Sequence, residues 1–247
     1  MKQKISGVCR LTGLLVLALV ALTGSSKALA DIEYQFNNVF DTSGGPPPAG
    51  SAPWVDAIFT DVKPGQVLLT ITNVNLTSGE FVDDSGGGIF FNLTPSLNVS
   101  NLVFSLVSST DPVAGENYNW FVETSEAQDG NGKGNNSGYG FKADGNGGFC
   151  DINLEFATHS FSTDGSITLL ITNIPGLDAA DFEATATGGN GEYAAVHVQG
   201  LGSGQSNSAW VNPTRVTPVP EPASTSFLAI GTGLFSAAHF WRRRTSV

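Results

Sequence analysis

The segment between residues 31 and 218 consists of short runs rich in valine, isoleucine, phenylalanine and threonine, and this pattern limits its fold more than any other feature. In the run Gln66–Val74, the apolar residues Val67, Leu69 and Ile71 occupy alternate positions, as they do along one face of a strand. Glycine, proline, asparagine and aspartate separate the runs, and no stretch keeps a helical period. The pattern predicts an all-β fold, a single β-sandwich or jelly-roll-like domain.

Eleven runs are predicted to be strands. They are Ile32–Phe40, Trp54–Asp61, Gln66–Val74, Gly88–Leu93, Asn101–Val107, Asn119–Glu123, Tyr139–Lys142, Cys150–Ala157, Ser166–Ile174, Asp181–Ala186 and Tyr193–Gln199. Gly65–Val74 and Gly165–Ile174 have similar sequences, which favours two equivalent hairpins, one in each half of the sandwich. Convergent strand composition is the alternative interpretation.

Residues 1–30 are predicted to be a signal peptide. Lys2, Lys4 and Arg10 form a positively charged n-region, and an apolar core follows from residue 11 to residue 22. Ala28 and Ala30 fit a small-x-small cleavage site, so the mature chain is expected to begin at residue 31. A retained N-terminal helix is the alternative.

The predicted domain, 31–218, is strongly acidic. It contains four basic and 21 acidic residues, a net charge of −17. Such a charge repels nucleic acid and anionic lipid headgroups, so no nucleic-acid partner is expected. It suits an extracellular, soluble and cation-associated domain, although simple solubility explains it equally well.

The last part of the chain, 219–247, combines three elements. Pro220, Glu221 and Pro222 precede 19 uncharged residues, 223–241, and Arg242, Arg243 and Arg244 follow at once. A helix of 19 residues is roughly 28 Å long, close to the thickness of a bilayer's hydrocarbon core. The arginines would place the C-terminus in the cytoplasm. A transmembrane helix is therefore predicted, with an amphipathic or buried helix as the alternative.

These three elements resemble the tripartite PEP-CTERM sorting signal, with Pro220, Glu221 and Pro222 matching the motif residue by residue. The resemblance implies a Gram-negative-type bacterium, passage through the inner membrane, and processing near the motif by exosortase, a membrane peptidase. It also implies anchoring by the helix until processing, and then a place at the cell surface or outside the cell.

Part of the domain is similar to a group of secreted PEP-CTERM proteins without assigned activity. The matching segments are Ala52–Trp54, Gly79–Val82, Phe90–Leu93, Gly140–Gly145 and Ala194–Gly200. The resemblance implies a β-rich extracellular domain and supplies no catalytic residues.

Two glycine-rich loops, Asp129–Gly134 and Asp144–Phe149, resemble sites for hard cations, because Asp-x-Asn spacing directs alternate oxygen ligands to one point. Neither loop completes the EF-hand pattern, and ordinary turn chemistry accounts for Asn-Gly and Asp-Gly pairs as well. If calcium binds, Asp144, Asn146 and Asp151 are the expected ligands; otherwise no cofactor is expected.

The sequence offers no catalytic constellation, so a non-enzymatic protein is expected. Cys150, the only cysteine of the predicted domain, is predicted to be a buried apolar residue rather than a nucleophile. His197 is expected to be an ordinary sheet residue.

The sequence therefore predicts mainly where the protein acts. It is expected to be an exported envelope or extracellular-matrix protein, associated with exopolysaccharide or biofilm. A carbohydrate-binding module, with or without calcium, is the alternative, and a surface hydrolase is less supported. Six aromatic residues are expected to belong to the core, and any that are exposed would stack on sugars. They are Tyr34, Trp54, Trp120, Tyr139, Tyr193 and Trp210.

Overall fold

The computed structural model describes residues 31–41, 45–82, 87–110, 120–124, 139–140, 148–156, 159, 161–203 and 207–216. The predicted signal peptide, the predicted sorting signal and the predicted ligands Asp144 and Asn146 lie outside these residues.

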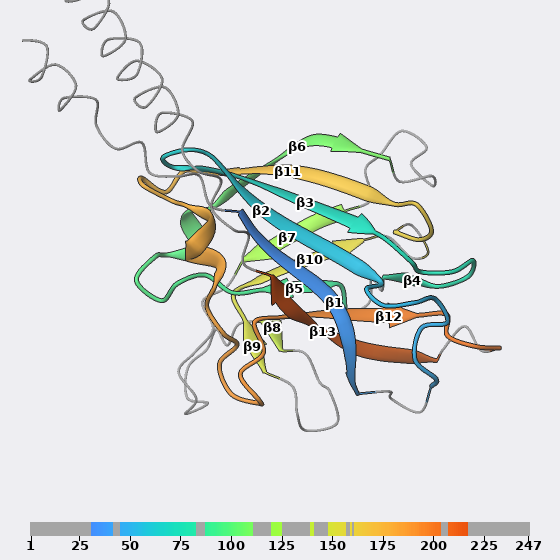
Figure 1. Ribbon diagram of the computed structural model, residues 1–247. Helices are drawn as coiled ribbons and strands as arrows, with labels where there is room; N and C mark the ends of the chain where they lie inside the picture. The colour runs from blue at the N-terminus through green and yellow to red at the C-terminus, as the bar shows by residue number, and fades with distance from the viewer. Residues whose placement is uncertain are drawn as a thin grey trace, which may run out of the picture. The chain divides into compact units, whose positions relative to one another are not determined.

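The described residues form one large antiparallel sheet (Figure 1). Eleven of their strands belong to it, in the order β6-β11-β3-β2-β1-β13-β12-β5-β10-β7, with β4 paired to β12. The strands are β1 (Asp31–Asp41), β2 (Val55–Lys63), β3 (Gln66–Asn73), β4 (Phe81–Val82), β5 (Ile89–Phe91), β6 (Val103–Ser109), β7 (Trp120–Thr124), β10 (Ile152–Phe156), β11 (Ser166–Thr172), β12 (Ala194–Gln199) and β13 (Ser208–Val216). A separate pair is formed by β8 (Tyr139–Gly140) and β9 (Phe149–Cys150).

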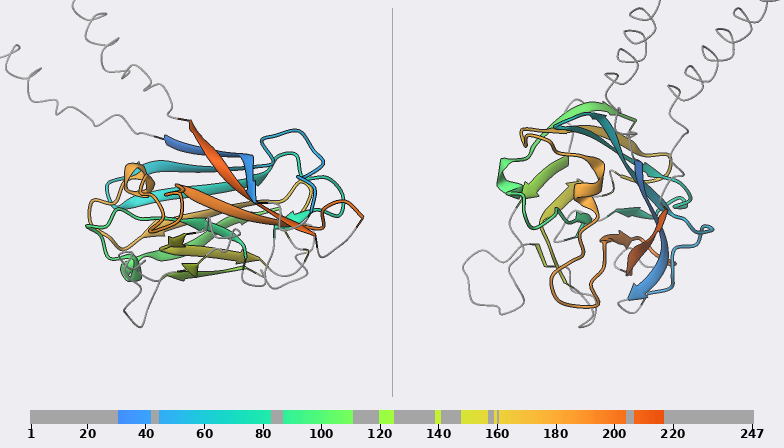
Figure 2. Two further views of the ribbon diagram at one scale, coloured as in Figure 1. Left: turned by 90° about the horizontal axis from the view of Figure 1, so that it is seen from below. Right: turned by 60° about the vertical axis from the view of Figure 1, so that its left-hand side comes forward.

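The sheet curls so that its inner face encloses the core (Figure 2). Leu106 of β6 and Val122 of β7, on the two outermost strands, pack against the same hydrophobic cluster. The predicted all-β class is confirmed. The sheet is continuous from one edge strand to the other, whereas the sequence suggested a sandwich.

The alternating apolar residues of the sequence supply this core. Val67, Leu69 and Ile71 of β3 are buried, and the residues between them are half-buried on the outer face. β1 contributes Tyr34, whose ring lies edge-on to Phe59 of β2 at a centroid distance of 6.2 Å. Burying such a side chain contributes about 1.5–3 kcal/mol. The alternation of apolar residues therefore determines both where the strands lie and which of their faces point inward.

The two similar sequences 65–74 and 165–174 form neighbouring strands, β3 and β11, which pair antiparallel with Leu69 opposite Leu169. Thr70 and Thr168 bring their hydroxyl oxygens to 3.3 Å on the outer face. The prediction of two equivalent hairpins is wrong, because the strand before β11 in the supposed second hairpin, β10, pairs with β5 and β7 instead.

The predicted strand Asp181–Ala186 is also wrong. Its first residues end a 3-10 helix, η2 (Ala179–Phe182), which Asp181 stabilises by accepting a hydrogen bond from the Asp178 backbone N–H at 2.9 Å. Ala179 and Phe182 are three residues apart, so they do not fit the alternation of a strand, but both are buried. The helix packs against β1 and β2.

Strand β13 was not predicted, because Pro213 interrupts it. Proline is tolerated there because β12 pairs only with residues 208–211 of β13. From Asn212 to Val216, β13 is hydrogen-bonded in the sheet to β1, so the missing N–H of Pro213 does not interrupt the pairing with β12.

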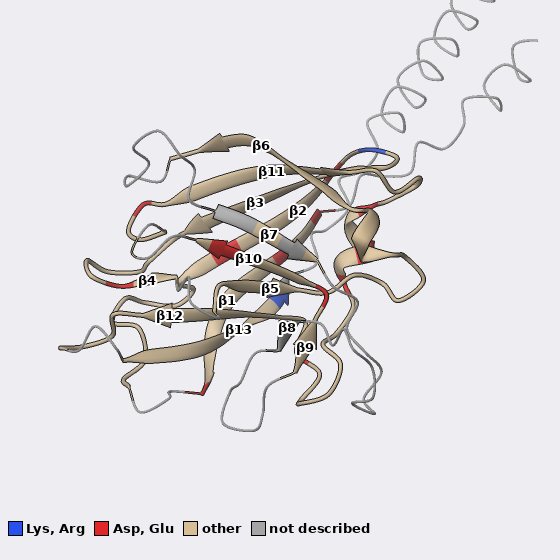
Figure 3. Ribbon diagram, turned by 180° about the vertical axis from the view of Figure 1, so that it is seen from behind, with Lys and Arg blue, Asp and Glu red and all other residues tan. Residues whose placement is uncertain are grey.

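Acidic residues occur on several strands and loops of the domain (Figure 3). Lys63 and Arg215 are the basic residues in the described part of the chain. Arg215 is paired with Glu183, with Nη2 and Oε1 2.5 Å apart.

Candidate functional site

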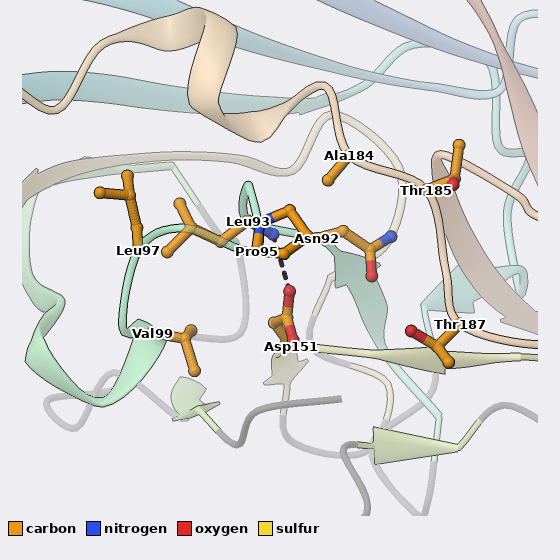
Figure 4. A pocket seen from close by; sticks show the side chains of 9 residues that line it. All are labelled: Asn92, Leu93, Pro95, Leu97, Val99, Asp151, Ala184, Thr185 and Thr187. Atoms are coloured by element: carbon orange, nitrogen blue, oxygen red, sulfur yellow. Dashed lines mark hydrogen bonds between the residues drawn. The ribbon is translucent and has the colours of Figure 1, made fainter. Parts of the chain in front are cut away.

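A cavity of about 150 Å³ lies between the end of β5, the link from β9 to β10, and the loop after η2. Its lining side chains divide into two groups (Figure 4). Asn92, Thr185 and Thr187 lie on one side, and Leu93, Leu97 and Val99 on the other, with Asp151 between them. The cavity is thus polar on one wall and apolar on the other.

Hydrogen bonds hold the polar wall in place. The Leu93 backbone N–H donates to Asp151 Oδ2 at 2.9 Å. Asn92, which is buried, donates from Nδ2 to the backbone carbonyl of Tyr193 at 3.1 Å. Both side chains are therefore oriented before any ligand arrives.

The two threonines are positioned by a short bridge to β9. Phe149 and Thr187 exchange two backbone hydrogen bonds of 2.9 Å, which fixes the loop after η2 beside the β9–β10 link. Asp151 occupies the bend between β9 and β10. Three distant parts of the chain thus meet at this cavity.

Cys150 lies behind the polar wall and is fully buried. Burial raises the pKa of its thiol well above the usual range, and a hydrogen bond with Asn92 opposes this shift only in part. The thiol is therefore protonated at neutral pH. It packs with Phe90, Ala195 and Trp210 in a small cluster on the outer face of the sheet, which confirms the prediction of a buried apolar cysteine.

The geometry provides a small, partly polar pocket with one carboxylate, one amide and two hydroxyl groups. In comparisons with protein-family models, curated proteins and solved structures, the chain matched none. The cavity must therefore be interpreted from its own residues.

Of the three predicted calcium ligands, the structure places Asp151 in the cavity wall. Asp144 and Asn146 lie outside the described residues. Within the described ranges, no three residues of the types His, Cys, Asp and Glu gather as a metal site. The calcium hypothesis stays a prediction.

Three of the four predicted aromatic residues whose side chains the structure describes are buried, as expected. Tyr34, Trp54 and Trp210 are buried. His197 stacks on Trp210 with ring centroids 4.4 Å apart, as expected of a packed sheet residue. Tyr193 is the exception at 37% exposure, and it adjoins the cavity through its carbonyl bond to Asn92. The side chains of Trp120 and Tyr139 lie outside the described part.

Sequence reasoning missed Asn92, Thr185 and Thr187. Nothing local marks them, since the fold alone brings residues 92, 151 and 185–187 together. Among the described residues, no helix has the length and apolarity required to cross a bilayer.

Proposed function

We propose that the chain is a non-enzymatic protein exported across the inner membrane of a Gram-negative-type bacterium and sorted to the cell envelope or extracellular matrix. The observation that carries this proposal is the order of elements in residues 219–247: the Pro-Glu-Pro motif, the uncharged segment 223–241 and the arginines at 242–244. The uncharged segment is a transmembrane anchor until an exosortase-type peptidase processes the chain.

The ends of the domain support this proposal. Strand β1 begins at Asp31, directly after the predicted cleavage site at Ala28 and Ala30. Strand β13 ends at Val216, three residues before Val219. Processing at both places would remove the flanking segments and leave intact every strand that the structure describes.

The charge of the domain supports a location among neutral polymers. Its net charge of −17 disfavours nucleic acid and anionic lipid surfaces. We infer that the domain's partner outside the cell is exopolysaccharide or another biofilm component.

Replacing Pro220, Glu221 and Pro222 together by alanine in the producing bacterium tests the sorting step. The variant should accumulate in the inner membrane at its unprocessed mass, because the peptidase no longer recognises it. Pro218→Ala, in the same linker, is the matched control and should be processed normally. Equal processing of both variants would refute the proposal.

A further inference from the structure

The cavity beside Asp151 has the size of a single six-membered ring. An apolar cavity of about 150 Å³ is known to accommodate benzene, and this one has about the same volume. A pyranose has about twice as many heavy atoms as benzene, so the cavity has room for part of one terminal unit of a chain and is too small for an oligosaccharide segment.

Its walls match a ring that is apolar on one face and carries hydroxyl groups at its edge. Leu93, Leu97 and Val99 offer an apolar surface. Thr185 and Thr187 carry hydroxyl groups on the other side of the cavity, and the carboxylate of Asp151 lies between the two sides (Figure 4). Small-ligand sites commonly combine apolar walls with a few fixed polar groups.

Two of the polar side chains, Asp151 and Asn92, are fixed in advance, which lowers the entropic cost of binding. The Asp151 carboxylate is held by the Leu93 N–H at 2.9 Å and Asn92 by the Tyr193 carbonyl at 3.1 Å. The hydroxyls of Thr185 and Thr187 can each donate and accept hydrogen bonds, which suits the hydroxyl groups of a sugar.

The charge of the site excludes acidic ligands. Asp151 is the one ionisable group among the lining residues, and the surrounding domain is strongly acidic. An anionic sugar or a phosphate would meet like charge in a confined space.

We propose that this cavity binds one neutral pyranose unit, the terminal sugar of a polysaccharide chain. The inference rests on the proposed function only for the source of that sugar, and its test is independent of sorting.

The test uses the purified full chain in a zwitterionic detergent without a sugar headgroup, with a chelator present throughout. Methyl glucopyranoside, mannopyranoside and galactopyranoside are titrated by saturation-transfer NMR and calorimetry. At least one should bind with a dissociation constant in the millimolar range, and methyl glucuronide should bind more weakly because of its charge.

Two variants locate the site. Ala184→Leu adds bulk to a residue that lines the cavity and should reduce binding at least tenfold. Thr185→Val removes one hydroxyl from an exposed position and should weaken binding about fivefold. Thr77→Val is the matched control, an exposed threonine away from the cavity, and should bind as the parent does.

Each outcome decides the proposal. Binding that Ala184→Leu weakens at least tenfold and that Thr77→Val retains would support it, provided both variants melt as the parent does. No binding of any neutral pyranoside, binding unaffected by Ala184→Leu, or a preference for the glucuronide would overturn it. Processing in cells is measured separately, so failure here would leave the sorting proposal standing.

Discussion

Glu33 of β1 lies directly opposite Val216 of β13 in the antiparallel pair that joins the first and last strands of the domain. The start of one strand and the end of the other therefore meet at the same end of the sheet. Arg215 reinforces this end by its bond to Glu183 after η2. The first strand of the domain thus begins beside the point where the last strand ends.

Tyr34→Phe should destabilise the domain by about 1–2 kcal/mol. The buried Tyr34 hydroxyl donates to the Phe182 carbonyl at 2.8 Å and ties β1 to η2, and its loss leaves that carbonyl without this partner. Urea unfolding followed by fluorescence measures the change. Tyr193→Phe, which alters an exposed ring, should change stability little, and an equal loss in both variants would contradict the assigned role.

Asp56→Asn should stabilise the domain above neutral pH. Burial, and secondarily the charge of Glu33, raises the pKa of Asp56 from 3.8 to about 6. Its Oδ1 is buried without a hydrogen-bond partner among the described residues. Because the folded-state pKa lies above the ordinary value, protonation favours the folded state. That contribution is fully present below pH 3.8 and is lost as the pH rises through about 6.

At about pH 8 the variant should be more stable than the parent by about 1 kcal/mol, after allowance for solvent screening of a half-buried group. The difference should shrink toward about pH 4. Chemical denaturation across this range measures it. Asp164→Asn is the control, since Asp164 is exposed in a turn with a φ of 64° that asparagine also adopts. A constant difference across pH would refute the role given to Asp56.

Gly88→Ala should cost several kcal/mol, because two penalties add. Gly88 has a φ of 109°, and a Cβ there would lie 2.5 Å from the Leu154 carbonyl oxygen of the neighbouring strand. Gly79 has a φ of 96° with open space around it, so Gly79→Ala tests backbone strain alone, about 1–3 kcal/mol. Thermal unfolding of both variants should show the larger loss at Gly88, and equal losses would mean that the close approach relaxes.

Strand positions could be predicted where alternation continued without interruption. β2, β3 and β11 follow from period-two patterns that also fixed their inward faces. β13 could not be predicted, because the cost of Pro213 depends on whether a neighbouring strand lies on its N–H side, and that is a property of the finished sheet. Similarity between 65–74 and 165–174 marked them as strands but not as direct partners.

The candidate site was less predictable than the strands. Asp151 was selected for a different reason, its spacing from Asp144 and Asn146. Its place in a cavity wall depends on the Phe149–Thr187 bridge, which joins segments about forty residues apart. Hydrogen bonds of this kind leave no local sequence pattern, so in the sequence Thr185 and Thr187 cannot be told from ordinary loop residues.

The most direct test of the account is the intact mass of the protein recovered from the surface of the producing cells. The account predicts a chain that begins at Asp31 and ends near the motif at Pro220–Pro222, so that residues 1–30 and the segment from Phe227 to Val247 are both absent. A surface form whose mass still includes Phe227 to Val247 would contradict processing at the sorting signal.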